Sequence, residues 1–147
     1  MRFITILVTT LVLTACQGDN KDISGSAISD YRGQWLVINY WAKWCKPCIK
    51  EIPELNEFDS KFDYVSVLGV NYDGAVGEDL AQQIRDFSIE FPILEEDPAT
   101  ELGTRRPTVL PTTLIVNPNG ELKETLLGPQ SVETLARAIE MATSKET

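Results

Sequence analysis

The chain has 147 residues, a formal net charge of -9 and no histidine. This length is enough for one domain with a hydrophobic core, and its content of hydrophobic (43%) and charged (24%) residues is typical of a globular protein. The acidic balance argues against nucleic acid as a partner, because phosphates require a basic surface. The absence of histidine excludes His-ligated metal sites and catalysis by Cys–His or Ser–His pairs.

The first residues have the pattern of an export signal. Arg2 supplies a positive charge, and the apolar stretch from Phe3 to Leu13 is too short to span a bilayer comfortably. It ends in Leu13-Thr14-Ala15-Cys16, which resembles the lipobox of bacterial lipoproteins, where the cysteine is lipidated and becomes the first mature residue. We therefore expect a lipoprotein signal peptide over residues 1–15 and lipidation at Cys16. An ordinary secretory signal and an uncleaved anchor are the alternatives.

The polar residues 16–29 are expected to form a tether between the lipid and a domain over residues 30–147. Export would place the chain in the bacterial cell envelope, facing the extracytoplasmic (periplasmic) side. Thiol–disulfide chemistry has substrates in that compartment.

Apolar and β-branched runs predict strands in this domain, and apolar residues at helical spacing predict helices. In chain order we expect a strand at 36–41, a helix ending near 61, a strand at 64–70, a helix at 78–88, a short extended piece at 91–94, a short helix at 97–103, strands at 112–116 and 121–127, and a last helix to about 142 with Leu135, Ile139 and Met141 on its apolar face.

The order of these elements predicts an α/β fold. A strand, a crossover helix and a second strand imply parallel pairing. The turn Asn117-Pro118-Asn119-Gly120 joins the next two strands into an antiparallel hairpin. We therefore expect a mixed central sheet with an antiparallel hairpin edge and helices on both faces, without a second domain.

Two cysteines lie two residues apart in Trp44-Cys45-Lys46-Pro47-Cys48, between a predicted strand and a predicted helix. A helix N-terminus has free N–H groups and a partial positive charge, so it favours a thiolate, which is the nucleophile in disulfide exchange. We therefore assign Cys45 as the attacking sulfur and Cys48 as the resolving one in a redox-active disulfide. A structural disulfide and half of a zinc site are the alternatives.

Two motifs in this domain are similar to those of the thioredoxin fold. The sequence from Trp41 to Cys48 matches the W-A-x-W-C-x-P-C signature, and Leu110-Pro111-Thr112-Thr113 lies where thioredoxins carry a cis-proline. Asn39 stands in place of the buried aspartate of thioredoxin, and an extra helical segment precedes the proline. With Glu51 three residues after Cys48, these features resemble the TlpA/ResA-like thiol–disulfide oxidoreductases.

This resemblance covers residues 25–143 and implies a thioredoxin-like fold and a membrane-anchored protein-disulfide reductase. It implies that Glu51 transfers the proton of the resolving thiol; an ordinary surface glutamate is the alternative. It also implies a cis bond before Pro111, a substrate chain paired with the backbone of Leu110, and a contact surface at Trp44.

We expect no cofactor and no metal, because the chain has no nucleotide-binding signature and no histidine. The expected partners are disulfide-containing substrate proteins, an upstream thiol electron donor in the membrane, and the lipid membrane itself through Cys16.

Several other functions are compatible with a thioredoxin-like fold. A copper-delivery module and c-type haem attachment usually require a histidine, and Ile49 follows the second cysteine. A peroxiredoxin-class peroxidase uses a single threonine-supported cysteine. A disulfide oxidase or isomerase and a non-catalytic adaptor remain as alternatives.

Basic residues flank both motifs in this acidic chain. Lys43, Lys46 and Lys50 surround the cysteines, and Arg105 and Arg106 precede the proline motif. Such a basic rim favours acidic partners or steers docking, with chance scatter as the alternative.

Overall fold

The computed structural model describes residues 24–145. The predicted signal peptide and Cys16 lie outside the described residues. The elements are β1 (Ser24–Ser26), the 3-10 helix η1 (Ile28–Tyr31), β2 (Trp35–Trp41), α1 (Lys46–Lys61), β3 (Val65–Asn71), α2 (Gly77–Phe87), β4 (Ile93–Leu94), β5 (Thr112–Val116), β6 (Leu122–Leu127) and α3 (Val132–Ser144).

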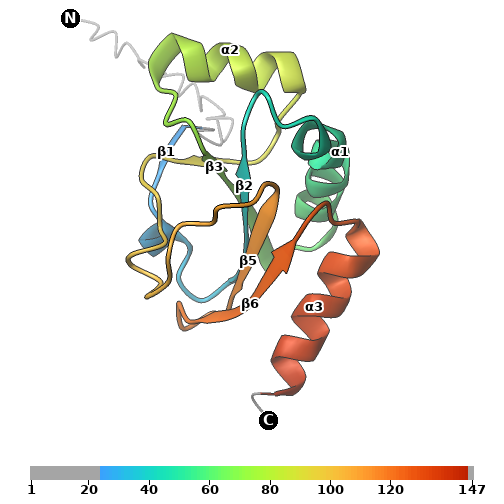
Figure 1. Ribbon diagram of the computed structural model, residues 1–147. Coiled ribbons are helices and arrows are strands. Elements are labelled where there is room, and N and C mark those ends of the chain that lie inside the picture. Colours follow the sequence, from blue (N-terminus) through green and yellow to red (C-terminus); the bar gives the residue numbers. More distant parts are fainter. Residues whose placement is uncertain (1–23, 146–147) are drawn as a thin grey trace, which may run out of the picture.

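A six-stranded sheet forms the centre of the domain, in the order β1-β4-β3-β2-β5-β6 (Figure 1). β1, β4, β3 and β2 are parallel, whereas β5 is antiparallel to β2 and β6 is antiparallel to β5. This confirms the predicted mixed sheet with an antiparallel hairpin at its edge. Because Thr112 pairs with Tyr40, the start of β5 lies beside the end of β2.

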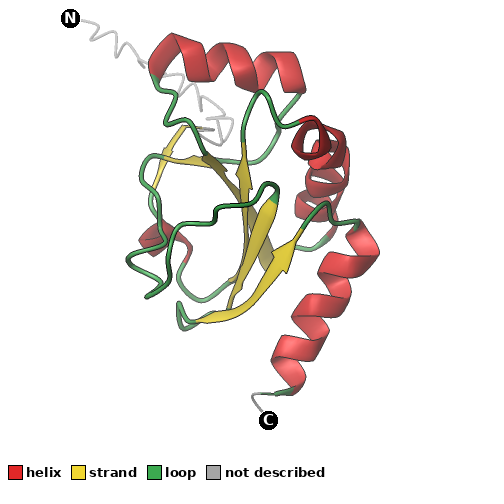
Figure 2. Cartoon of the chain, in the orientation of Figure 1, coloured by secondary structure: helices red, strands yellow, loops and turns green. Residues whose placement is uncertain are grey.

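Alternate residues of β2 face opposite sides of the sheet and belong to two hydrophobic clusters. On one side, Val37 and Trp41 pack with buried residues of α1 and α3; on the other, Ile38 and Tyr40 pack with Ile28 of η1. Figure 2 shows α1 and α3 beside each other at the right of the sheet, whereas η1 lies at its left. Both faces of the sheet thus contact a helix, and β2 is buried along its whole length.

Three parts of the fold differ from the prediction. β1 pairs with β4 and η1 follows it, so residues 24–29 of the predicted tether belong to the folded domain. Their polar composition did not indicate a strand. Residues 98–103 form consecutive turns rather than the predicted helix over 97–103, because so short a segment cannot nucleate a helix alone. Asp97 Oδ1 accepts a hydrogen bond from the Ala99 N–H at 3.0 Å. Met141 of α3 is exposed and does not belong to the apolar face.

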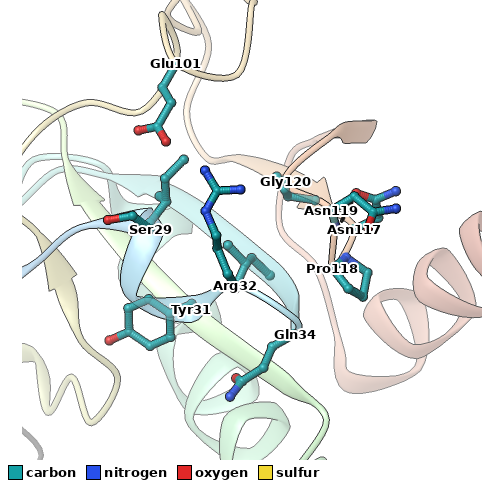
Figure 3. Close-up of a pocket in the computed structure, with 12 residues that line it drawn as sticks. Ser29, Tyr31, Arg32, Gln34, Glu101, Asn117, Pro118, Asn119 and Gly120 are labelled. Carbon is teal, nitrogen blue, oxygen red and sulfur yellow. Dashed lines mark hydrogen bonds between the residues drawn. The ribbon is translucent and has the colours of Figure 1, made fainter.

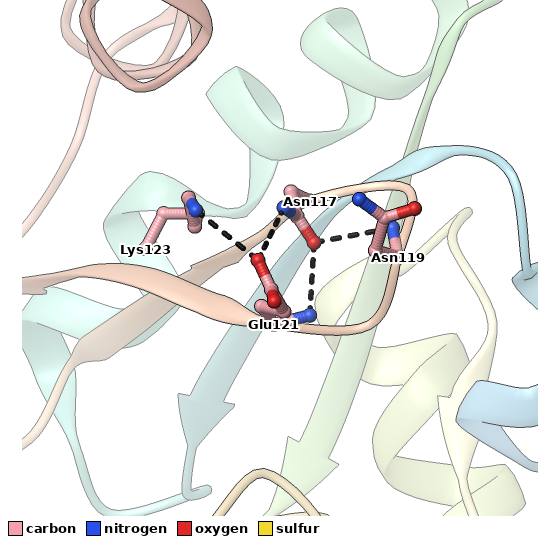
Figure 4. A network of polar contacts seen from close by, with 4 residues as sticks. All are labelled: Asn117, Asn119, Glu121 and Lys123. Atoms are coloured by element: carbon pink, nitrogen blue, oxygen red, sulfur yellow. Dashed lines mark hydrogen bonds and ion pairs between the residues drawn. The ribbon is translucent and has the colours of Figure 1, made fainter. Parts of the chain in front are cut away.

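The hairpin turn between β5 and β6 is held by one buried side chain (Figure 4). Asn117 Oδ1 accepts hydrogen bonds from the N–H groups of Asn119 and Glu121, at 3.1 and 2.9 Å, and its Nδ2 donates to Glu121 Oε2 at 3.0 Å. Gly120 has a φ of 84°, which glycine adopts without strain. The predicted turn chemistry is therefore confirmed, and it fixes the register of the hairpin.

Candidate active site

The cysteine pair lies at the start of α1, just after β2. Cys45 is the N-cap residue, and an S–S bond of 1.99 Å joins it to Cys48 in the first turn. Cys45 Sγ also accepts a hydrogen bond from the Cys48 N–H, at 3.3 Å. Cys45 is 4% exposed and Cys48 is fully buried, so an incoming sulfur atom meets Cys45 first.

Glu51 lies one helical turn beyond Cys48 and is only 2% exposed. Its Oε1 accepts a hydrogen bond from Asn39 Nδ2 at 2.7 Å, and its Oε2 accepts one from the Gln130 backbone N–H at 2.8 Å. Asn39 belongs to β2, and Gln130 lies between β6 and α3. The carboxyl group therefore connects three separate parts of the chain, and the alternative of an ordinary surface glutamate is wrong.

Burial raises the pKa of Glu51 to about 7, against the opposing effect of the hydrogen bonds from Gln130 and Asn39. A carboxyl group with this pKa is present in both protonation states near neutral pH, as proton transfer requires. An open groove lined by Pro47, Lys50 and Gln130 reaches Glu51. This groove provides a route for proton exchange with solvent.

Asn39 is a polar side chain in an otherwise apolar strand. Its Nδ2 also donates to Thr113 Oγ1 at 3.1 Å, while its Oδ1 has no hydrogen-bond partner among the residues that the structure describes. If the amide turned by 180°, Oδ1 would face Glu51 and Thr113. The Thr113 hydroxyl can donate a hydrogen bond to Oδ1, and so can the Glu51 carboxyl group when it is protonated. Asn39 can therefore form a hydrogen bond with Glu51 in either protonation state, and the bond to the ionised carboxylate is the stronger one.

Trp44 lies next to Cys45 and is 61% exposed, but its ring is held in place. The indole Nε1 donates to both carboxylate oxygens of Asp73, at 3.1 and 3.0 Å. The ring meets Tyr72 edge-on, with 6.5 Å between the ring centroids. The indole is thus an ordered, exposed apolar surface beside the cysteine pair.

Arg106 connects the loop before β5 to this aromatic pair. Its guanidinium lies 4.0 Å from the centroid of the Tyr72 ring, and it donates a hydrogen bond to the Tyr72 carbonyl oxygen. Its Nε forms an ion pair with Asp97 at 2.8 Å, and Asp97 accepts a hydrogen bond of 2.6 Å from the buried Tyr40 hydroxyl. Burial and the contact with Asp97 raise the pKa of Tyr40 far above its usual value. Its sequence position places Arg106 among the basic residues that favour acidic partners. In the structure its charge is paired with Asp97 within the fold.

The peptide bond between Leu110 and Pro111 is cis, as the resemblance implies. Pro111 is buried directly before β5, and Leu110 packs against the hydrophobic cluster that includes Cys45 and Cys48. The two segments predicted to contact substrate thus meet at one end of the sheet.

Several residues of this site had no clear signal in the sequence. Tyr72, Asp73 and Asp97 come from turns whose placement depends on the tertiary fold, and Gln130 contributes a backbone N–H, which any residue except proline offers. Asn39 had a readable signal, since an amide within a buried apolar strand requires a partner.

A separate pocket of about 140 Å³ lies at the other end of the sheet, where η1 meets the hairpin turn (Figure 3). The pairing of Leu36 with Val116 places this end at the start of β2, roughly 20 Å from the end that leads to the cysteines. In Figure 3, Glu101 and Arg32 point toward one another at this pocket. None of the predicted site residues within 24–145 lines it.

Over residues 24–145, no cluster of three or more His, Cys, Asp or Glu side chains is arranged to hold a metal ion. In the same range, no helix has both the length and the apolar character needed to cross a membrane.

Comparisons with known proteins identify a family and two relatives that are named thiol-disulfide oxidoreductases. The AhpC/TSA family matches residues 11–125. The thiol-disulfide oxidoreductase ResA of Geobacillus kaustophilus is 35% identical over 118 residues, which span 77% of this chain and 66% of that protein. The sporulation thiol-disulfide oxidoreductase A of Bacillus subtilis is 30% identical over 120 residues, spanning 78% of this chain and 73% of that protein.

A solved structure supports the thioredoxin-like fold. The crystal structure of StoA from Bacillus subtilis matches with a TM-score of 0.60 and 26% sequence identity, and the match covers 74% of this chain and 84% of that one.

Proposed function

The chain belongs to the AhpC/TSA family and to the ResA-like thiol–disulfide oxidoreductases, and on this premise we propose that it is an extracytoplasmic, membrane-anchored protein-disulfide reductase. The observation that carries the proposal is the Cys45–Cys48 disulfide at the start of α1, with the buried carboxyl group of Glu51 one turn beyond it.

The reaction begins with the reduced pair. The Cys45 thiolate attacks one sulfur of a substrate disulfide, so that a bond to Cys45 forms, the substrate S–S bond breaks, and the leaving sulfur takes up a proton. Cys48 then attacks Cys45 Sγ, restores the Cys45–Cys48 disulfide and releases the second substrate thiol. The substrate gains two electrons, and an upstream thiol carrier returns two electrons to the protein by the same exchange.

Glu51 accepts the proton that Cys48 loses when it attacks, and it returns a proton when the pair is reduced again. Its position one turn along α1 and its pKa of about 7 support this role. The hydrogen bonds from Asn39 and Gln130 hold the carboxyl group in place, and the groove beside it lets the proton exchange with water.

The substrate docks beside the pair on Trp44 and on the segment of Leu110 and Pro111. The exposed indole offers an apolar contact, and the backbone of Leu110 offers hydrogen-bonding groups to an extended chain. Both elements lie at the end of the sheet where Cys45 is located.

The membrane anchor is lipid attached to Cys16, which follows a signal peptide over residues 1–15. The charge at Arg2, the apolar stretch and the lipobox-like string support this part of the proposal. Because β1 begins at Ser24, the tether between the lipid and the folded domain is residues 16–23. Metabolic labelling with a fatty acid tests the anchor: the wild type incorporates the label, and Cys16→Ser does not.

The direct test of function is the reduction of insulin disulfides in the presence of a small dithiol donor. Wild-type protein accelerates the reaction, Cys45→Ser abolishes the acceleration, and Cys48→Ser accumulates a mixed disulfide through Cys45. If the wild-type protein did not accelerate insulin reduction, the alternative of a non-catalytic adaptor would be favoured. A reduction potential well above that of thioredoxin (about -270 mV) would favour the oxidase or isomerase alternative instead.

A further inference from the structure

The charges of this acidic chain are unevenly distributed around the cysteine pair. Residues 43–50 contain three lysines and no acidic residue, and residues 102–111 contain two arginines and no acidic residue. The whole chain nevertheless carries a formal net charge of -9. Two cation-only segments beside the cysteine pair of such a protein require an explanation.

The structure separates these five cations into two groups. Arg106 is neutralised by its ion pair with Asp97 and stacks on Tyr72. The other four are exposed, and none of them forms an ion pair within the described part of the chain. We call these four the cationic rim: Lys43, Lys46, Lys50 and Arg105.

The nearby carboxylates form hydrogen bonds with other groups and no ion pair with the rim. Glu51 is buried below the pair, and Glu54 Oε2 accepts a hydrogen bond of 3.0 Å from the Val132 N–H at the start of α3. Asp73 accepts both hydrogen bonds from the Trp44 indole. Among residues 24–145 the rim therefore has no ion-pair partner, and its exposed charges are available to a substrate that approaches Cys45.

We infer that the cationic rim selects substrates whose disulfide lies next to aspartate or glutamate side chains. This inference rests on the proposed reductase function and names the substrate class of the same site. Lys43 and Lys46 flank Cys45 in the sequence, so carboxylates beside a substrate disulfide would contact the rim when the sulfur atoms meet. The attraction raises the association rate and opposes substrates with basic residues at the same positions.

Three small dialkyl disulfides that differ in charge test the inference. They are 3,3′-dithiodipropionate with two carboxylates, bis(2-hydroxyethyl) disulfide with no charge, and cystamine with two ammonium groups. The pre-reduced full chain is mixed with each, and the single-turnover oxidation of the pair is followed. At low salt we expect the dicarboxylate to react roughly ten times faster than the diammonium compound. The ratio should fall toward one at about 0.5 M salt, where charges are screened.

Neutralising variants locate the effect. Lys43→Gln with Lys46→Gln should lower the ratio of dicarboxylate to neutral rates by about threefold or more. This ratio cancels any change in the intrinsic reactivity of Cys45. Lys61→Gln is the control for position, since it removes a positive charge at the far end of α1 and should leave the ratio unchanged.

The outcomes separate the two proposals. Equal rates for all three compounds at low salt, with the neutral compound still reduced, would overturn substrate selection by the rim and leave the reductase function standing. A pair that reacts with none of them would overturn the reductase function and the rim inference with it.

Discussion

Two buried polar networks lie at opposite ends of the same sheet, and they differ in how completely they are satisfied. At the hairpin end, both side-chain atoms of Asn117 have hydrogen-bond partners, and its neighbour Glu121 also contacts Lys123 at 3.2 Å (Figure 4). At the cysteine end, Asn39 holds Glu51 but leaves its own Oδ1 without a partner in residues 24–145.

Under the proposed function, this difference separates a network that stabilises the fold from one that takes part in proton transfer. A fully satisfied network fixes one conformation and stabilises the fold. A network with an unpaired acceptor and a carboxyl group of pKa about 7 has a second arrangement available to it, which is useful when a proton must come and go. Variants at the hairpin end should therefore change stability, whereas variants at the cysteine end should change pH dependence.

The largest expected effect is on the pH dependence of stability at the cysteine end. The pKa of Glu51 is raised from its ordinary value of 4.5 to about 7 in the folded state. The folded state therefore holds this proton more tightly, and its contribution to stability is full below pH 4.5 and is lost as the pH rises through 7. Over this range we expect a loss of roughly 3 kcal/mol in the free energy of unfolding of the oxidised protein.

Urea unfolding at a series of pH values measures this slope. Glu51→Gln should remove it, since glutamine does not titrate and Asn39 can turn its free Oδ1 toward the new amide. A variant that keeps the same slope would show that another group carries it.

The next effect is expected at the hairpin end. Asn117→Ala removes the acceptor of two backbone N–H groups, at Asn119 and Glu121, so about 2 kcal/mol of stability should be lost. Urea unfolding measures this loss. The rate of insulin reduction under stable conditions should stay at the wild-type value; a large drop in that rate would remove the distinction between the two networks.

A smaller effect is expected from Asn39→Leu, which is similar in size. It removes a hydrogen bond that lowers the pKa of Glu51, so this pKa should rise above its wild-type value of about 7. Carboxyl carbon NMR of selectively labelled glutamate measures the titration. An unchanged or lower pKa in the variant would mean that Asn39 does not stabilise the carboxylate.

The sequence was sufficient where local patterns and tertiary packing agree. The apolar run of β2, the Asn-Gly hairpin turn and the helix start at Cys45 each have a strong local pattern, and the structure contains all three. Pro111 was identified by resemblance rather than by physical reasoning, since an isomer state leaves no trace in composition.

The remaining parts depend on contacts between distant segments. β1 is short and polar, and it exists as a strand because β4 offers an edge for pairing. The engagement of Arg106 depends on Tyr72 and Asp97, which the fold brings together from two separate turns. Contacts between distant segments leave no regular spacing of residue types in the sequence, so sequence patterns do not predict them.

The central claim is that Glu51 exchanges its proton with the cysteine pair, and the pH dependence of thiol alkylation tests it most directly. The reduced wild type, Glu51→Gln and the control Glu54→Gln are treated with iodoacetamide from pH 4 to 10. The negative charge of an ionised Glu51 disfavours a nearby thiolate, so removing it should move the alkylation curve about one unit to lower pH. Glu54→Gln should leave the curve in place. Superimposable curves for the wild type and Glu51→Gln would contradict the claim.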